Sequence, residues 1–264
     1  MITFDRFYEG KRHILTMSYD DGTVYDRKLV EIFNRYGIRG SFHLNSGFFG
    51  KERYISADEV AGLYQGHEVS VHTLTHPHLE QVSPTNAVIQ VLDDRKNLEA
   101  LCGYPVRGMS YPFGTYNDSV LETLRQCGIV CSRTVRATKG FGLPGNFLEW
   151  HPTCHHRDAL ALADQFMKNF DAPFRIPLFY VWGHSYEFND NNNWDLIEEF
   201  CKRLGGRDNI WYATNIEIYD YITAQHRLQI STDNKIIHNP SAQTVWVAND
   251  GETIEIKGGQ TVRL

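Results

Sequence analysis

Strand-like and helix-like segments alternate along roughly the first 225 residues of this chain. Short apolar runs, among them His13–Ser18, Gly40–Leu44 and Glu68–His72, have the length and composition of buried strands. Amphipathic stretches lie between them, and Asp26–Tyr36 carries its apolar residues at helical spacing. Repeated strand-then-helix units predict an α/β fold with a parallel sheet, and about seven units suit a distorted (β/α) barrel better than an open sheet.

The same patterns predict the rest of this region. Ser56 and Glu59 form a capping box, and Ser83-Pro84 joins an N-cap to a favoured first-turn proline. In chain order we expect a helix from Ser56 to Tyr64, a helix from Ser83 to Leu101, a strand at Val106–Tyr111, a helix at Asp118–Gln126, a strand at Gly128–Thr134, a long loop from Val135 to His156, a helix at Asp158–Asn169, a strand at Ile176–Trp182, a helix at Trp194–Leu204, a strand at Ile210–Ala213 and a helix at Asn215–Ala224.

The pattern changes near Arg227. Gln243–Ala248 and Thr253–Ile256 alternate apolar and polar residues on either side of Asn249-Asp250-Gly251, which is typical of a β-hairpin. We therefore divide the chain into a barrel at residues 1–226 and a small antiparallel β appendage at residues 227–264. The appendage is expected to be structural, since only Trp246 offers an obvious platform for a sugar ring.

Composition excludes several classes of protein. The 264 residues are 42% hydrophobic and 22% charged, which is ordinary for a globular domain. The net charge is −6 and the pI about 6.0, and no basic stretch resembles a nucleic-acid footprint. Five cysteines without a CxxC pair make a disulfide framework improbable. The first residues lack an apolar signal region and no run approaches the ~20 residues of a membrane span, so we expect a cytoplasmic protein.

Four polar motifs follow predicted strands, at the barrel end where sites of such folds lie. Asp20 and Asp21 are adjacent, so one carboxylate can bind a metal while the other faces a water molecule. His72 and His76 are four residues apart and can bend toward one point, which would complete a site with open positions. The motifs are Ser18-Tyr19-Asp20-Asp21-Gly22, His72-Thr73-Leu74-Thr75-His76, Tyr111-Pro112-Phe113-Gly114 and Val181-Trp182-Gly183-His184.

From about Ile14 to Ala224, the order of these motifs resembles the polysaccharide deacetylase family, the nodulation-factor deacetylase homology domain of carbohydrate esterases. The resemblance implies a distorted β/α barrel. It also implies that Asp21, His72 and His76 are metal ligands and that Asp20 is the catalytic base, with Thr73 steadying the loop between the histidines by hydrogen bonding. His184 would be the general acid, a task suited to a pKa near neutral.

The chain departs from the family pattern in its arginine. The family usually has an arginine just before the third motif to orient the base, whereas Ser110 stands there in this chain. Arg133, at the C-terminal end of the next strand, is our preferred partner for Asp20. Arg107 is the alternative, although it would lie near the start of its strand.

The family's fourth motif, a tryptophan-containing aspartate-rich stretch, is not recognisable, and Glu149-Trp150-His151-Pro152 occupies that loop. Trp150 is expected to line the pocket. Tyr111-Pro112-Phe113 is expected to bind substrate, with the aromatic rings stacking on a sugar face and a backbone N–H near Phe113 holding an oxyanion. The residues expected to tune His184 are His155, His156 or Asp158.

These features predict a metal-dependent hydrolase that removes acetyl groups, N-acetyl before O-acetyl, from an acetylated sugar or oligosaccharide. Zinc is the first expected metal, and cobalt, nickel or manganese would suit the same ligands. No nucleic-acid or membrane partner is expected, and the sequence predicts no oligomeric state.

Three other interpretations stay open. The first is an amidohydrolase that uses the same metal site on a small or cyclic amide, which a missing secretion signal would favour. The second is a sugar-binding protein without catalysis, which the intact candidate site argues against. The third is a non-haem iron oxygenase, which also uses two histidines and one carboxylate; the doubled aspartate and the barrel pattern count against it.

Overall fold

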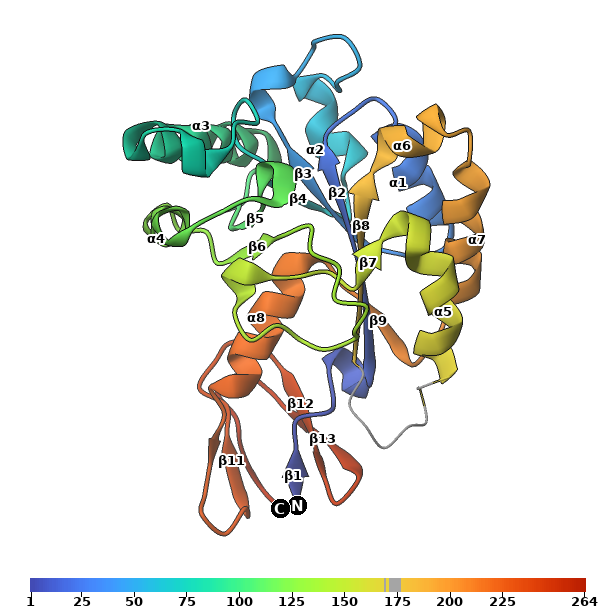
Figure 1. Cartoon of the computed structure of the whole chain (residues 1–264). Helices are drawn as coiled ribbons and strands as arrows, with labels where there is room; N and C mark the ends of the chain where they lie inside the picture. The colour runs from blue at the N-terminus through green and yellow to red at the C-terminus, as the bar shows by residue number, and fades with distance from the viewer. Residues whose placement is uncertain (169, 171–176) are drawn as a thin grey trace.

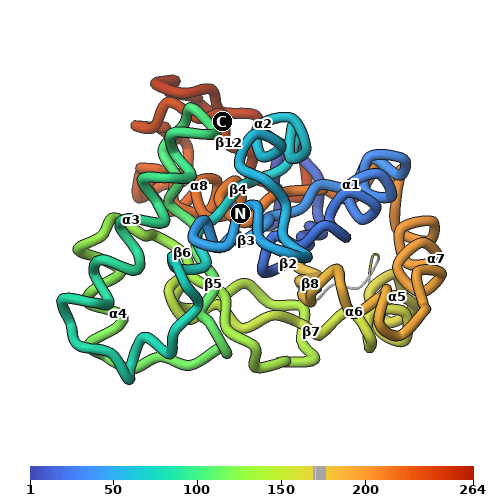
Figure 2. The backbone as a smooth tube through the Cα atoms, turned by 90° about the horizontal axis from the view of Figure 1, so that it is seen from above, coloured from blue at the N-terminus to red at the C-terminus, as the bar shows by residue number. Residues whose placement is uncertain are grey.

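A curled sheet of parallel strands forms the centre of the computed structural model, which describes residues 1–168, 170 and 177–264 (Figure 1). Seven strands follow the order β6-β5-β4-β3-β2-β8-β7, and β9 pairs with the start of β2. The (β/α) barrel prediction is therefore confirmed, with the sheet curled as Figure 2 shows from above. The strands are β2 (His13–Asp21), β3 (Gly40–Leu44), β4 (Glu68–Val71), β5 (Gly108–Ser110), β6 (Cys131–Arg133), β7 (Cys154–His155), β8 (Leu178–His184) and β9 (Ile210–Tyr212).

Helices cover the outside of this sheet (Figures 1 and 2). The Ser56 capping box is present, and Ser83 accepts the N–H of Asn86 at the start of the longest helix. The sequence patterns did not predict β7 or α6, and the expected element ends Asn169 and Ile176 lie outside the described residues. The helices are α1 (Asp26–Arg35), α2 (Val60–Leu63), α3 (Pro84–Cys102), α4 (Asp118–Gln126), α5 (Ala159–Lys168), α6 (Ser185–Asp190), α7 (Trp194–Leu204) and α8 (Asn215–His226).

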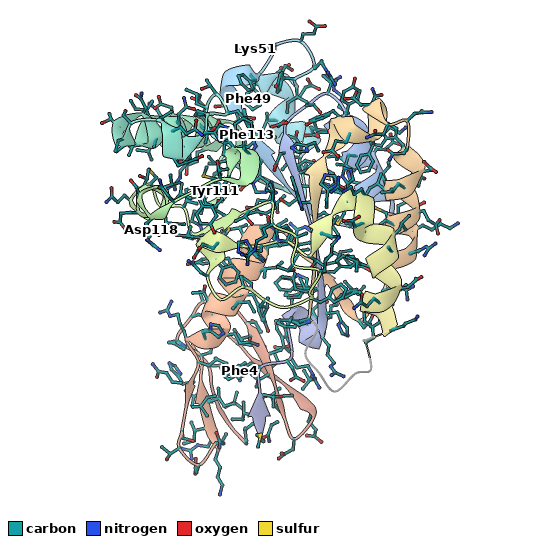
Figure 3. All side chains as sticks on the ribbon, viewed as in Figure 1. Phe4, Phe49, Lys51, Tyr111, Phe113 and Asp118 are labelled. Carbon is teal, nitrogen blue, oxygen red and sulfur yellow. The ribbon has the colours of Figure 1, made fainter. Side chains whose placement is uncertain are left out.

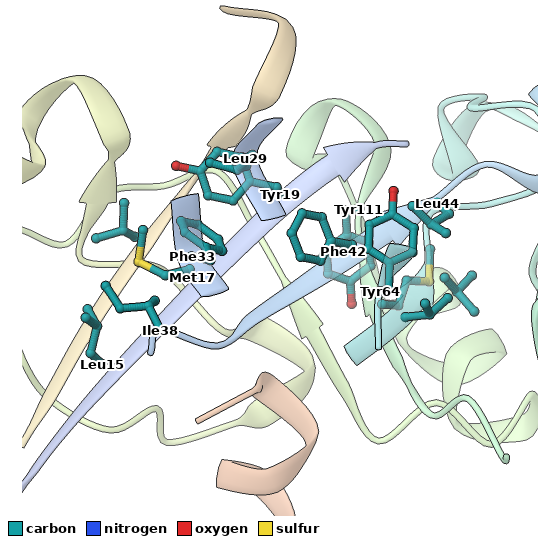
Figure 4. Packing of buried hydrophobic residues seen from close by; sticks show 14 of the residues in the cluster. Leu15, Met17, Tyr19, Leu29, Phe33, Ile38, Phe42, Leu44, Tyr64 and Tyr111 are labelled. Carbon is teal, nitrogen blue, oxygen red and sulfur yellow. The ribbon is translucent and has the colours of Figure 1, made fainter. Parts of the chain in front are cut away.

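The two faces of the barrel strands differ in polarity. Because side chains alternate along a strand, Leu15, Met17 and Tyr19 of β2 point outward and pack with residues of α1 such as Leu29 and Phe33 (Figure 4). The other face encloses buried polar residues, most of which form hydrogen bonds. They are Thr16, Ser18 and Asp20 on β2, Ser41 and His43 on β3, Glu68 and Ser70 on β4, His72 directly after β4, Ser110 on β5 and Arg133 on β6.

Hydrogen bonds link this polar interior to α8 at the N-terminal end of the strands. Asn215, at the start of α8, donates its side-chain amide to Thr16 Oγ1 at 2.9 Å and accepts the hydroxyl of Tyr180 at 2.7 Å. Glu68 accepts the hydroxyl of Ser41 at 2.7 Å and the backbone N–H of Ile216 at 3.0 Å. The barrel thus has a bonded polar core where many barrels hold apolar layers.

One stretch, residues 150–155, joins the two edges of the curled sheet, and we call it the seam segment. Trp150 exchanges backbone bonds with β6, accepting from Thr134 and donating to Ser132, both at 3.0 Å. Three residues later, Thr153 donates its N–H to Tyr180 of β8 at 2.9 Å. The predicted long loop therefore contains a short strand, β7, and connects the first and last strands of the sheet.

Antiparallel strands lie below the barrel in Figure 1, as the hairpin pattern predicts. One sheet has the order β1-β12-β13 and the other β10-β11-β14, so one of these strands comes from the start of the chain. Trp246 is 9% exposed and its ring packs on Tyr8 and Tyr221, so it joins the sheet to α8 and offers no sugar platform. The strands are β1 (Ile2–Thr3), β10 (Gln229–Ile230), β11 (Ile236–His238), β12 (Val245–Asn249), β13 (Glu252–Ile256) and β14 (Thr261–Arg263).

All five cysteines lie within the described residues and are free thiols. Among the helices of the described part of the chain, none combines the length and the apolar character that a membrane span requires.

Candidate functional site

Two adjacent aspartates reach the same site because the backbone changes conformation at the end of β2. Asp20 continues the inward-pointing series of Thr16 and Ser18, so regular alternation would turn Asp21 outward. Asp21 instead has a φ of 81°, in the left-handed region that non-glycine residues seldom adopt. Its carboxylate lies 3.6 Å from His72 Nε2, on the same side as Asp20.

Asp21, His72 and His76 form a compact group of possible metal ligands. The Asp21 carboxylate is 3.6 Å from His72 Nε2 and 3.8 Å from His76 Nε2, and the three donor atoms lie within 4.8 Å of one another. The loop between the histidines is strained at both ends, with φ of 69° at Thr73 and 57° at His76. The Thr73 hydroxyl accepts the His76 N–H at 3.0 Å and holds that loop.

His72 is held as a neutral ring with one nitrogen facing this group. Burial lowers its pKa to about 3, and the opposing charge of Asp20 does not restore it. His72 Nδ1 lies 2.9 Å from the carbonyl oxygen of Ser110, which accepts a hydrogen bond from the Nδ1–H. The lone pair is therefore on Nε2, the atom nearest Asp21, and a neutral imidazole of this kind is the form that binds metals.

Two buried residues that the motifs did not indicate hold the histidine loop from behind. Asp94, on α3, accepts the backbone N–H of His72 at 3.1 Å and that of Ser46 at 2.7 Å. Asn45 donates its side-chain amide to the carbonyl oxygens of His72 and Thr73 at 2.5 and 2.8 Å. The sequence signal for Asp94 was an acidic residue at helical spacing from the apolar residues Ala87, Val91 and Leu98, which are buried in α3.

Asp20 lies in the barrel interior between two hydrogen-bond donors. Arg133 forms an ion pair with its Oδ2, and Ser110 donates its hydroxyl to Oδ1 at 2.9 Å. The guanidinium is fully buried, also donates to Ser18 Oγ at 3.0 Å and lies over the Trp182 ring at 4.5 Å. Burial would raise the pKa of Asp20, but the charge of Arg133 holds it well below the usual range.

The other arginine that the sequence offered lies elsewhere. Arg107 forms an ion pair with Asp220 of α8, with 2.6 Å between the closest atoms and side chains 34% and 40% exposed. It precedes β5, at the opposite end of the strands from Asp20. The structure thus pairs Asp20 with Arg133, while Ser110 fills the position where the family has its arginine.

His184 contacts a carboxylate that the motifs did not identify. Its Nδ1 lies 2.5 Å from Oε1 of Glu187, which is in the first turn of α6. The same carboxylate lies 3.2 Å from His155 Nε2 and 3.3 Å from His156 Nε2. Asp158, another sequence-based candidate, instead pairs with Lys139 at the surface. A glutamate three residues after His184, at helical spacing, was the signal that could have found this contact.

The contacts around His184 favour its protonated form. Burial alone would lower its pKa, but the hydrogen bond to Glu187 and the charges of Asp20 and Asp21 raise it above the ordinary value. The pKa of Glu187 lies well below its usual range because hydrogen bonds from the three histidines outweigh burial. A proton donor and an ionised acceptor, Asp20, therefore lie on neighbouring strands, with Asp20 and His184 in register.

The predicted substrate-binding residues separate into buried and exposed positions. Phe113 is 52% exposed, has a φ of 58° and stacks on His78 at 3.8 Å and edge-on to His76 at 4.5 Å. Tyr111 and Trp150 are each 1% exposed, and the Tyr111 hydroxyl donates to Leu148 O at 2.7 Å. Tyr111 and Phe113 are labelled in Figure 3, and Figure 4 shows Tyr111 among the packed core residues. Pro112 is also buried. In this structure only Phe113 offers a free face, so stacking of Tyr111 and Trp150 on a sugar is not supported by their positions.

A cavity of about 260 Å³ opens beside Asp21, on the side formed by α6 and the loop after β3. Tyr54 and Tyr186 contribute aromatic surface, and Arg53 contributes a charge held near the Tyr186 ring. Its lining consists of Asp21, Thr23, Glu52, Arg53, Tyr54, Tyr186 and Asp190.

Sequence comparison places the first half of the chain among known proteins. Residues 7–132 match the sequence profile of the polysaccharide deacetylase family. A chitooligosaccharide deacetylase from Sinorhizobium fredii is 26% identical over 132 residues, which are 49% of this chain. The chain spans 60% of the length of that relative.

Solved structures share the fold over a longer part of the chain. Peptidoglycan deacetylase PdaC from Bacillus subtilis, a variant with one substitution, superposes with a TM-score of 0.55 at 16% identity and covers 81% of this chain and 93% of its own. A family 4 carbohydrate esterase pseudoenzyme from Bacillus anthracis superposes with a TM-score of 0.53 at 16% identity and covers 78% of this chain and 65% of its own. The matching profile and motifs relate residues 7–132 to the polysaccharide deacetylase family, and the chain shares the barrel fold of these solved structures.

Proposed function

We propose that this chain is a metal-dependent hydrolase that removes acetyl groups from a carbohydrate, with N-acetyl preferred over O-acetyl. The observation that carries the proposal is the meeting, at one end of the barrel, of three candidate metal ligands, an ionised Asp20 and a His184 whose pKa is raised. The match of residues 7–132 to the polysaccharide deacetylase profile supports the same reaction class. The intact site also favours catalysis over binding alone.

The residues of the candidate site fit a divalent metal. Asp21, His72 and His76 offer one carboxylate oxygen and two imidazole nitrogens, a donor set typical of catalytic zinc sites with open positions. His72 is already neutral with its lone pair facing the group. A metal held there would polarise an acyl carbonyl and make a water molecule more acidic, and zinc is our first choice over cobalt, nickel or manganese.

Asp20 is suited to accept the proton of the attacking water. Its Oδ2 lies 3.9 Å from His72 Nε2, beside the candidate ligands and outside that group. Arg133 and Ser110 each fix one of its oxygens, so the carboxylate keeps its orientation as charge develops. Because its pKa is low, Asp20 is ionised at any working pH and available as an acceptor.

His184 is suited to donate a proton to the leaving group. Glu187 takes the hydrogen bond of Nδ1, which leaves Nε2 as the atom that can face a substrate. An amide expels an amine only when its nitrogen is protonated, whereas an ester releases its alcohol more readily. A dedicated donor with a raised pKa therefore supports an N-acetyl substrate.

Two walls would bind the sugar. Phe113 is half-exposed and meets the candidate ligand His76 edge-on, and backbone N–H groups near Phe113 would hold the developing oxyanion. On the other side, Tyr54 and Tyr186 line the cavity next to Asp21.

The test is acetate release from a panel of acetylated oligosaccharides by metal-stripped protein, with and without added zinc or cobalt. We expect release only after metal is restored, and loss of activity to background in Asp20→Asn with the fold checked by circular dichroism. Hydrolysis of small or cyclic amides without acetate release from any sugar would move the function to the amidohydrolase alternative. Full activity in Asp20→Asn would contradict the catalytic assignment.

A further inference from the structure

A second group of metal-binding side chains lies beside His184. His155, His156 and Glu187 each offer one donor atom, and these atoms lie within 4.8 Å of one another. None of the three belongs to the first group of Asp21, His72 and His76. We infer that His155, His156 and Glu187 form a second site for a divalent transition metal of the zinc class.

The distances in this group suit a metal ion. Ligand atoms about 2.0–2.1 Å from a tetrahedral zinc are separated by about 3.3 Å. Glu187 Oε2 lies 3.2 Å from His155 Nε2 and 3.3 Å from His156 Nε2. These separations are closer to that value than the 3.6 and 3.8 Å found between Asp21 and the histidines of the first group.

The second group is also held by ordered elements. His155 ends β7 and pairs in register with Trp182 of β8, and its ring lies 4.9 Å from the Trp182 ring. His156 is 3% exposed and stacks on Phe188 at 4.1 Å. Glu187 is in the first turn of α6. The donors are therefore placed before any metal arrives, which reduces the entropy lost on binding.

Switching between hydrogen bonds and metal binding needs little movement. Without metal, the Nε2–H groups of His155 and His156 donate to the Glu187 carboxylate at 3.2 and 3.3 Å. With metal, each ring changes tautomer, so that Nε2 presents a lone pair and Nδ1 carries the proton; His155 Nδ1 then gives up the Arg157 N–H that it accepts at 3.4 Å. The side chains of Glu187 and His155 are 24% and 13% exposed, so an ion and its water ligands can reach the site.

The site shares its carboxylate with the candidate proton donor. Glu187 Oε1 lies 2.5 Å from His184 Nδ1, Oε2 lies 3.3 Å from His156 Nε2, and His155 Nε2 lies 3.2 Å from both oxygens. One glutamate can thus contact both a metal and His184. The inference concerns metal binding alone and does not rest on the proposed function.

The test is the number of zinc ions bound by the metal-stripped full chain in equilibrium dialysis. We expect two per chain for the wild type, one for His155→Ala and one for His76→Ala, and two for the control His238→Ala, a histidine of the distant antiparallel sheet. One zinc in the wild type, unchanged in His155→Ala, would overturn the inference. Loss of that single zinc in His155→Ala but not in His76→Ala would support it and count against the first site.

A second measurement guards against misfolding of the variant. Anomalous diffraction at the zinc edge, from wild-type crystals soaked in zinc, should place one ion on His155, His156 and Glu187. A single anomalous peak on Asp21, His72 and His76, with none on the second group, would reject the second site.

Discussion

Glu187 is the residue whose contacts most change the interpretation of His184. It accepts from His184 at 2.5 Å and helps to raise the pKa of that ring against the effect of burial. Glu187 is therefore the residue that tunes His184, a role for which the sequence offered His155, His156 or Asp158. A carboxylate hydrogen-bonded to Nδ1 both fixes the tautomer of an imidazole and stabilises its protonated form.

Replacing Glu187 should therefore affect the pH dependence of the reaction. His184 donates only while protonated, so activity should fall as the pH rises through its raised pKa. In Glu187→Gln that pKa drops, so the alkaline limb of kcat/KM should move to lower pH and the maximal rate should fall at least about tenfold. Asp158→Asn, which removes only a surface partner of Lys139, is the matched control and should keep the wild-type profile.

Arg133 and Arg107, the two candidate partners of Asp20 in the sequence, should differ sharply in how much their replacement lowers the free energy of unfolding. Removing Arg133 leaves the buried charge of Asp20 without its partner, so Arg133→Met should lower the free energy of unfolding by about 3–5 kcal/mol. Arg107→Gln breaks a half-exposed pair with Asp220 and should cost under about 1 kcal/mol. Urea denaturation of both variants makes the comparison, and equal losses would contradict the buried pairing.

Residue type and position in a motif predicted where functional side chains gather, but not how exposed they are. Tyr111 follows a strand and Trp150 lies in a predicted loop, as pocket residues do, yet both are buried in the core. Their exposure depends on segments distant in sequence, such as the loop at Leu148 that accepts the Tyr111 hydroxyl. Alternation along a single strand carries no information on such covering segments.

Among the elements, α3 supports the candidate metal site from outside the barrel. Its Asp94 accepts the N–H groups of His72 and Ser46, which follow β4 and β3. The helix thereby fixes the ends of two strands relative to each other. Support of this kind around a ligand is expected to influence metal affinity.

Asp94→Asn tests this support. The amide can accept only one of the two N–H groups and places its own N–H₂ against the other, which leaves a buried donor unpaired. We expect zinc affinity to fall by about 10- to 100-fold, measured by competition with a chelator. Asp93→Asn changes the neighbouring, exposed residue of α3 and should leave the affinity unchanged.

At the scale of elements, long periodic segments were predictable and short ones were not. Three predicted segments agree with the structure at both ends, because each buries a full face of a strand or a full stripe of a helix. They are Gly40–Leu44, Asp118–Gln126 and Trp194–Leu204. The six residues of α6 are too few to show a helical period, and β7 has only two residues. These short elements carry Glu187 and His155, so the missed part of the site follows from the missed elements.

Considered as a whole, the molecule contains buried carboxyl groups whose pKa values are raised toward neutral pH. Burial raises the pKa of Asp26, Glu68 and Asp94 to about 7 in each case, against hydrogen bonds that would lower it. Buried histidines act in the opposite sense, since burial lowers the pKa of His43 and His72 to about 3. The two kinds of group affect the pH dependence of the free energy of unfolding in opposite senses. Comparing a single variant with the wild type therefore isolates the contribution of one group.

Glu68→Gln should become relatively more stable as the pH rises. Glu68 has an ordinary pKa of 4.5 when unfolded and about 7 when folded, so its contribution is complete below about pH 4.5 and is lost as the pH rises through 7. Between pH 5 and 8 the variant should gain on the order of 2–4 kcal/mol relative to the wild type. Melting temperatures across this range test it, and a constant difference would show that Glu68 titrates normally.

The seam segment has a consequence for how such a barrel diversifies. Its bonds to β6 and β8 use main-chain atoms of Trp150 and Thr153, and the Thr153 hydroxyl also accepts the Tyr180 N–H at 3.1 Å. Closure of the barrel therefore constrains few side chains of the segment besides Thr153. The same stretch ends in His155, beside Glu187. Substitutions there can alter the surroundings of the proton donor while the scaffold persists. Exchange of this stretch between homologues would therefore be a direct way to change substrate specificity.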